Sequence, residues 1–150
     1  MRDTHYLIRR AFYAVLQGQV TYAGQIVNFY DEKKKASSSD NVYAIFSTQQ
    51  SSRSQDSNDS TWITDERIDI EITQKQGFEV TKDFIDDVSN QMYQLLMPTR
   101  GQDALPVQNE MQFRNVELET ALTRSVQISP TETIISKVIT FSLQAVQQME

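Results

Sequence analysis

The feature that most constrains the fold is the run of residues 65–73, where isoleucines alternate with charged or hydroxyl side chains. Ile68, Ile70 and Ile72 stand at every second position, and successive side chains of a β-strand point to opposite faces of a sheet. One face of this segment is therefore expected to lie on a hydrophobic core while the other meets water. The pattern predicts a half-buried strand.

A helix is expected after this strand, over residues 81–96. Thr81 can cap its first turn, and Pro98 sets its end because a proline cannot continue a helix. Its apolar residues recur at steps of three and four, which places them along one stripe. They are Phe84, Ile85, Val88, Met92, Leu95 and Leu96. Strand and helix together predict a domain in which helix packs on sheet.

An earlier helix is expected to begin at Asp3 or Thr4 and to end at Gly18. Its apolar side consists of Leu7, Ile8, Ala11, Phe12, Val15 and Leu16. β-branched and aromatic residues then predict one or two short strands across residues 20–30, broken at Gly24. A short buried strand is predicted across residues 42–48.

The C-terminal part is expected to form a long β-hairpin after a loop at residues 99–109. Its strands span residues 111–128 and 133–145, with a turn at residues 129–132. One face of the last strand carries Ile135, Ile139, Phe141, Leu143 and Ala145. The predicted fold class is α+β, with a mixed, mainly antiparallel sheet packed against two helices. The length of 150 residues fits a single domain, residues 1–150.

Residues 49–61 are almost all Ser, Gln, Asp or Asn, and a long polar loop between two strands is expected there. Loops of this length are usually functional or disordered, and both interpretations remain open. We expect the loop to be mobile in isolation and to order against a neighbouring subunit. The candidate assembly contacts are Arg53, Asp56, Asn58 and Asp59, with Arg53 as the ion-pair former because it is the only cation there.

Candidate catalytic residues are sparse. His5 is the only histidine and is expected on a helix surface rather than in a Ser-His-Asp site. Asp83, Asp86 and Asp87 cluster early in the second helix, where carboxylates complement the helix dipole. A paired-carboxylate or magnesium site is the alternative for these aspartates. No catalytic, cofactor-binding or metal site is predicted, and a protein without enzymatic activity is expected.

Charge and hydropathy exclude some classes of function. The net charge of -6 argues against a protein that grips nucleic acid, because phosphate affinity comes mainly from clustered Lys and Arg. The three lysines at residues 33–35 are interpreted as part of a solvated loop. No apolar run approaches the ~20 residues of a membrane helix, and the N-terminus lacks a signal-peptide core. We expect a protein that stays in the cytosol or enters a structure assembled there.

The predicted elements follow a distinctive order along nearly the whole chain. An N-terminal helix comes first, followed in turn by segments at residues 20–22, 26–27, 42–46 and 62–72, the helix at 81–96 and a long strand at 134–146. This order resembles that of the tail completion and tail terminator proteins of long-tailed bacteriophages. The resemblance lies in the order and hydrophobic character of the segments. The polar insertion at residues 50–60 is longer than in that family, and the turn at 129–132 lacks the glycine expected there.

The resemblance implies a structural virion protein that forms a ring, hexameric in the family, at the head-proximal end of the phage tail. Such a ring caps the tail tube and connects it to the neck. The implied partners are the tail tube protein and the neck or head-completion proteins, and genomic DNA passes through without sequence-specific binding. The protein would be assembled in the host cytoplasm and reside in the virion, with no cofactor and no membrane.

Three other interpretations stay open. The chain could be a head-closure adaptor or another neck ring protein. A monomeric binding module would use an open strand edge or the loop at 50–60 to capture a partner. An enzyme would require a pocket with perturbed titratable groups, and its best candidates are the aspartates of the second helix.

Overall fold

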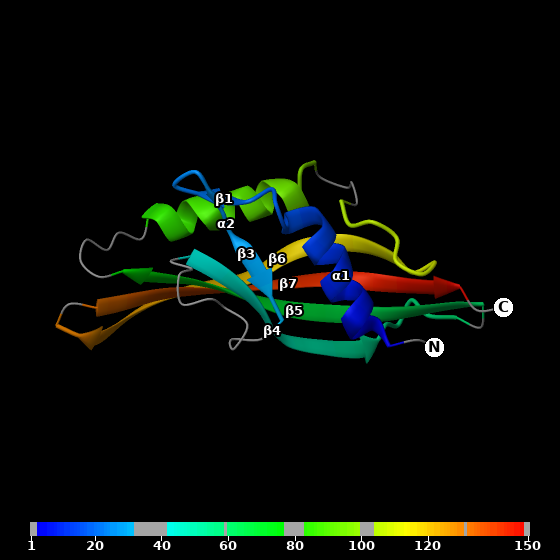
Figure 1. Ribbon diagram of the computed structural model, residues 1–150. Coiled ribbons are helices and arrows are strands. Elements are labelled where there is room, and N and C mark those ends of the chain that lie inside the picture. Colours follow the sequence, from blue (N-terminus) through cyan, green and yellow to red (C-terminus); the bar gives the residue numbers. More distant parts are fainter. Residues whose placement is uncertain are drawn as a thin grey trace.

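The structure is a computed structural model that describes residues 3–31, 42–58, 60–76, 83–99, 104–130 and 132–148. Within these ranges it contains two helices and seven strands. In chain order they are α1 (Thr4–Leu16), β1 (Thr21–Tyr22), β2 (Gln25–Ile26), β3 (Asn28–Tyr30), β4 (Val42–Arg53), β5 (Thr61–Gln76), α2 (Asp83–Leu96), β6 (Gln112–Ser129) and β7 (Glu132–Gln148). Strands β1 and β2 form a small sheet, and the others form a five-stranded sheet in the order β3-β4-β5-β7-β6 (Figure 1).

The pairing of the five-stranded sheet confirms the predicted fold class. β3 is parallel to β4, and the other neighbouring pairs are antiparallel. β6 and β7 form the predicted C-terminal hairpin, and Ser129 pairs with Glu132 at its turn. The sheet is therefore mixed and mainly antiparallel, with two helices in the described chain.

The central strand β5 and helix α2 form as their residue patterns predict. Ile68, Ile70 and Ile72 are fully buried, whereas Asp65 and Arg67 on the other face of the strand are exposed and Asp69 and Glu71 are half-buried. α2 ends at Leu96, ahead of Pro98. Its buried side includes Ile85, Val88, Met92 and Leu96. The predicted cap Thr81 and the side chain of Phe84 lie outside the described part.

Helix α1 begins at a cap that the sequence indicates. The Asp3 carboxylate accepts a hydrogen bond of 3.0 Å from the backbone N–H of His5, which satisfies one of the free donors of the first turn. The helix ends at Leu16, before Gly18, whose φ of +84° is favourable only for glycine. Three short strands follow instead of one or two, and the predicted break at Gly24 lies between β1 and β2.

Both helices cover the same face of the sheet (Figure 1). Phe141 of β7 contacts both helices, because its ring centre lies 5.9 Å from that of Phe12 in α1 and 6.1 Å from that of Tyr93 in α2. We call the opposite side of the sheet the open face. It is formed by Gln50 and Ser52 of β4, by Asp65, Arg67 and Asp69 of β5, by Thr140, Ser142 and Gln144 of β7, and by Glu117, Thr120 and Leu122 of β6.

The predicted polar loop at residues 49–61 is wrong in its extent. β4 continues to Arg53 and β5 begins at Thr61, so only residues 54–60 connect the two strands. Residues 49–53 pair with residues 64–68 of β5 after a bulge that follows Phe46. The backbone N–H and C=O groups of this segment form hydrogen bonds with β5, and these bonds do not depend on the type of side chain. The polar composition therefore did not predict the strand.

Candidate interaction surface

Three of the four predicted assembly residues, Arg53, Asp56 and Asn58, lie at the β4–β5 end of the sheet. The guanidinium of Arg53 lies 4.5 Å from the centre of the Trp62 ring, a cation–π contact within the subunit. The Asp56 carboxylate accepts a hydrogen bond of 3.3 Å from the amide of Gln144. Asp59 lies outside the described residues. A contact between these residues and a neighbouring subunit stays a prediction.

Asn58, the remaining predicted contact, shapes the turn at residues 54–60. Its side-chain oxygen accepts hydrogen bonds from the backbone N–H groups of Ser60, at 2.9 Å, and Thr61, at 2.8 Å. The Ser57 hydroxyl donates to the Ile63 carbonyl at 2.6 Å and accepts from the Ile63 N–H at 2.8 Å. Ser54 is buried. Short polar side chains therefore hold this segment against β5 by hydrogen bonds.

The structure brings His5 to a serine and a buried carboxylate. The Nε2 atom of His5 lies 2.7 Å from the Ser51 hydroxyl, which donates its proton to Glu66. Glu66 is only 1% exposed and also accepts from the Thr64 hydroxyl at 2.9 Å. In a Ser-His-Asp triad the imidazole stands between hydroxyl and carboxylate, whereas here the hydroxyl stands between the other two groups. This network joins the beginning of α1 to β4 and β5.

Two aspartates of α2, Asp86 and Asp87, have hydrogen-bonding partners within the subunit. The Nζ atom of Lys137 lies 2.9 Å from the Asp86 carboxylate and 2.9 Å from the Ser89 hydroxyl. Asp87 accepts a hydrogen bond of 2.9 Å from Gln91, one turn along the helix. The side chain of Asp83 lies outside the described part. Among the described residues there is no group of three or more metal-ligating side chains placed to hold an ion.

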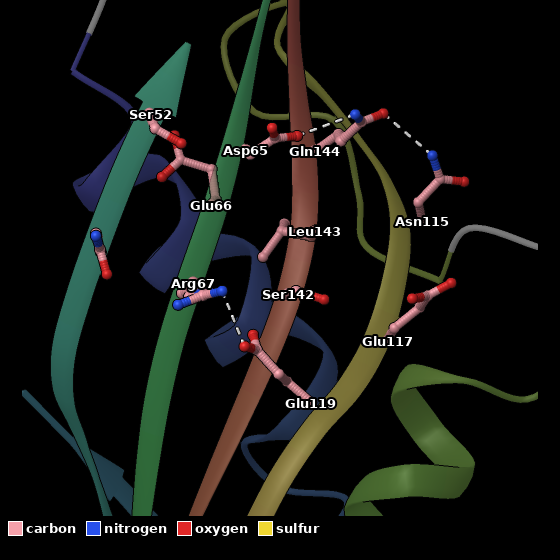
Figure 2. A pocket seen from close by; sticks show the side chains of 11 residues that line it. Ser52, Asp65, Glu66, Arg67, Asn115, Glu117, Glu119, Ser142, Leu143 and Gln144 are labelled. Atoms are coloured by element: carbon pink, nitrogen blue, oxygen red, sulfur yellow. Dashed lines mark hydrogen bonds and ion pairs between the residues drawn. The ribbon is translucent and has the colours of Figure 1, made fainter. Parts of the chain in front are cut away.

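The open face contains a shallow groove of about 630 Å³. Figure 2 shows Asp65 and Arg67 of β5, Ser142 and Gln144 of β7, and Glu119 of β6 directed toward it. A second hollow of about 280 Å³ adjoins it and is lined by Asp69, Thr140 and residues of the first groove. Asp65 accepts from Gln144 at 3.0 Å and Asp69 accepts from Thr140 at 2.6 Å. These hydrogen bonds cross from β5 to β7 and give the face a fixed polar surface.

The two hollows are acidic. Arg67 is the cation in their lining, and its Nη2 atom lies 3.0 Å from Glu119 (Figure 2). The lining carboxylates are Asp65, Glu66, Asp69, Glu117 and Glu119. A bulge between Leu118 and Thr120 inserts Glu119 into β6 beside this face. The excess negative charge repels polyanions rather than binding them.

Strand β6 lies at an edge of the five-stranded sheet. It pairs with β7 along one edge, and no other named strand of the described ranges pairs with its second edge. Three of its large aliphatic side chains are exposed: Leu118 at 43%, Leu122 at 60% and Val126 at 57%. An open strand edge with exposed aliphatic residues favours association with another chain. The sequence predicts the strand, but the exposure follows from its position in the sheet.

No family model matches the sequence, and no curated protein matches it. Within the described ranges, neither α1 nor α2 is long and apolar enough to cross a membrane.

Proposed function

We propose that this chain is a structural virion protein that forms a ring at the head-proximal end of a bacteriophage tail. In this role it caps the tail tube, connects the tail to the neck and leaves a channel for DNA. The order of elements that suggests this family in the sequence is also the order of the folded chain, from α1 through the strands and α2 to the C-terminal hairpin.

The observation that carries the proposal is the open edge of β6. This strand spans 18 residues, and its aliphatic side chains Leu118, Leu122 and Val126 are exposed in the single chain. Proteins that act as monomers usually shorten, charge or cover such an edge. A closed ring of identical subunits covers an open edge on every subunit by one repeated heterologous contact. Association of copies is therefore the simplest use of this surface.

The distribution of charge supports a channel for DNA. The helices occupy one face of the sheet, and carboxylates dominate the hollows of the open face. A lumen lined with Lys and Arg would hold the phosphate backbone through counterion release, whereas an acidic lumen lets DNA move. We therefore assign the open face to the channel side of the ring and the helices to its outer side.

Three measurements test this function. Electron microscopy of the purified chain, alone and mixed with the tail tube protein of the same phage, should show rings with a central opening. Mass spectrometry of purified particles should find the chain, and antibody labelling should place it where the tail meets the head. Absence of the chain from particles would contradict the proposal. Labelling at the head vertex without tails would instead favour a head-closure adaptor.

A further inference from the structure

We infer that the open edge of β6 pairs with residues 46–53 of β4 in a second copy of this chain, as antiparallel strands. The inference rests on the proposed function, because this contact would be the one that repeats around the ring. It names the two surfaces that meet, which the order of elements alone leaves open.

The sheet has a second open edge on its other side. β3 covers β4 only at residues 43–45, so residues 46–53 of β4 have no strand partner on that side within the described chain. We call this segment the open half of β4. Each subunit thus has one open edge on β6 and another on β4. A contact between two β6 strands would cover only the first edge, whereas contact between β6 and β4 covers both in every subunit of a closed ring.

The strand directions fit such a contact. β4 is antiparallel to β5, β5 to β7 and β7 to β6, so β4 and β6 run in opposite directions. Subunits related by rotation about a ring axis keep the same direction along that axis. The β6 of one copy and the β4 of the next are therefore antiparallel, which allows the hydrogen-bond ladder of the sheet to continue across the boundary.

Charge complementarity favours the same pairing. Between Val116 and Thr123 the charged residues of β6 are Glu117 and Glu119, both exposed. In the open half of β4 the charged residue is Arg53, also exposed. Arg9 of α1 also lies on this side, where its Nη1 atom donates to Gln49 at 2.6 Å and its Nε atom lies 3.7 Å from the Asp31 carboxylate. β6 also carries Arg114 and Arg124 toward its two ends, so the attraction to Arg53 acts where the middle part of β6 meets β4.

Cysteine cross-linking tests the contact directly, because the chain contains no cysteine. We choose exposed positions on the open face of both edges: Thr120→Cys and Leu122→Cys in β6, and Gln50→Cys and Ser52→Cys in β4. Directly opposite residues of antiparallel strands have Cβ atoms about 4.5–5.5 Å apart, which a disulfide can span after a small adjustment. The four β6–β4 combinations cover neighbouring registers.

Each combination is mixed as two purified variants, one carrying a mass tag, and oxidised at increasing concentration. The inference expects a disulfide-linked dimer that contains one tagged and one untagged chain, in at least one combination. A chain with both substitutions should give a ladder of covalent multimers that ends at the ring. Ser142→Cys in β7 is the matched control, since it lies on the same face in an interior strand and should not cross-link.

Three results overturn the inference. A β6 variant that cross-links with itself alone shows that two β6 strands meet. Cross-linking of the Ser142→Cys control at the same rate shows random collision. Absence of any cross-link in all combinations shows that the edges do not pair.

If rings are nevertheless seen by electron microscopy, the proposed function survives while this contact fails. If the chain is missing from particles, the proposed function fails even where the cross-link forms.

Discussion

Strands β5 and β6 belong to the same sheet but use their side chains differently. β5 is paired along both edges, by β4 and β7, and it buries three isoleucines beneath the helices. Among the strands of the described ranges β6 pairs only with β7, and every residue from 117 to 122 is exposed. The two strands are of similar length, 16 and 18 residues, so their position in the sheet determines the difference.

The comparison separates residues that fold the subunit from residues that can join subunits. Burial of an aliphatic side chain contributes about 1.5–3 kcal/mol, and Ile68, Ile70 and Ile72 obtain this within the single chain. Leu122 and Val126 are exposed in the single chain, so they can contribute this burial free energy only when another chain covers them. Substitution in β5 should therefore affect stability, while substitution in β6 should affect assembly.

The largest effect is expected for Ile70→Asp in β5 and Val88→Asp in α2. Both side chains are fully buried in one hydrophobic cluster, and a carboxylate there has no partner. The cost should be about 4 kcal/mol or more, which is comparable with the whole stability of a domain of this size. Circular dichroism and thermal unfolding should show an unfolded chain.

The matched control is Val126→Asp in β6, which makes a similar aliphatic-to-acid change at an exposed position. This variant should stay folded with a nearly unchanged melting temperature. If Ile70→Asp and Val88→Asp were also folded and soluble, the assignment of the helix-covered face would be wrong.

A smaller effect is expected for Ser51→Ala in β4. Its hydroxyl donates to the buried Glu66 carboxylate and lies beside His5, so alanine leaves one carboxylate oxygen without this donor. We expect a loss of about 1–3 kcal/mol of unfolding free energy in chemical denaturation. Ser52→Ala is the control, because Ser52 is exposed on the open face and should change stability by less than about 0.5 kcal/mol. Equal effects of the two substitutions would contradict the anchoring role of Ser51.

The sequence predicts the elements whose patterns are local. The alternation in β5, the stripe of α2 and the turn of the C-terminal hairpin each depend on residues near one another in the chain, and the structure confirms them. The polar half of β4 is not predictable in this way. Its stability depends on pairing with residues 64–68 and on the network from Ser51 to Glu66.

The candidate surface depends on long-range pairing in the same way. β7 lies between β5 and β6, so the last strand of the chain enters the sheet and leaves β6 at the edge. No periodicity within β6 indicates this order. Lys137 offers a second example, because it shares the core side of β7 with Ile135 and Ile139, yet pairs with Asp86 of α2. Only the packed helix explains a lysine there.

A still smaller effect is expected for Asn58→Ala in the turn at 54–60. The substitution removes the acceptor for the N–H groups of Ser60 and Thr61, at an exposed site where water can replace it. The loss should be about 1 kcal/mol in chemical denaturation. Gln55→Ala, at an exposed position of the same turn, should have almost no effect. If Asn58→Ala lowered the unfolding free energy no more than Gln55→Ala does, Asn58 would not shape the turn.

The smallest effect on stability, together with a large effect on assembly, is expected for Leu122→Lys in β6. Leu122 is 60% exposed, so lysine should change the unfolding free energy by less than about 0.5 kcal/mol. A lysine on an open strand edge opposes strand addition, because pairing would desolvate its charge. Ring formation, measured by light scattering and electron microscopy, should fall.

Gln94→Lys on the exposed side of α2 makes the same change in charge away from both edges and should assemble normally. If the two variants assembled equally well, β6 would have no part in the ring contact, and the contrast between β5 and β6 would reflect only the packing of a monomer.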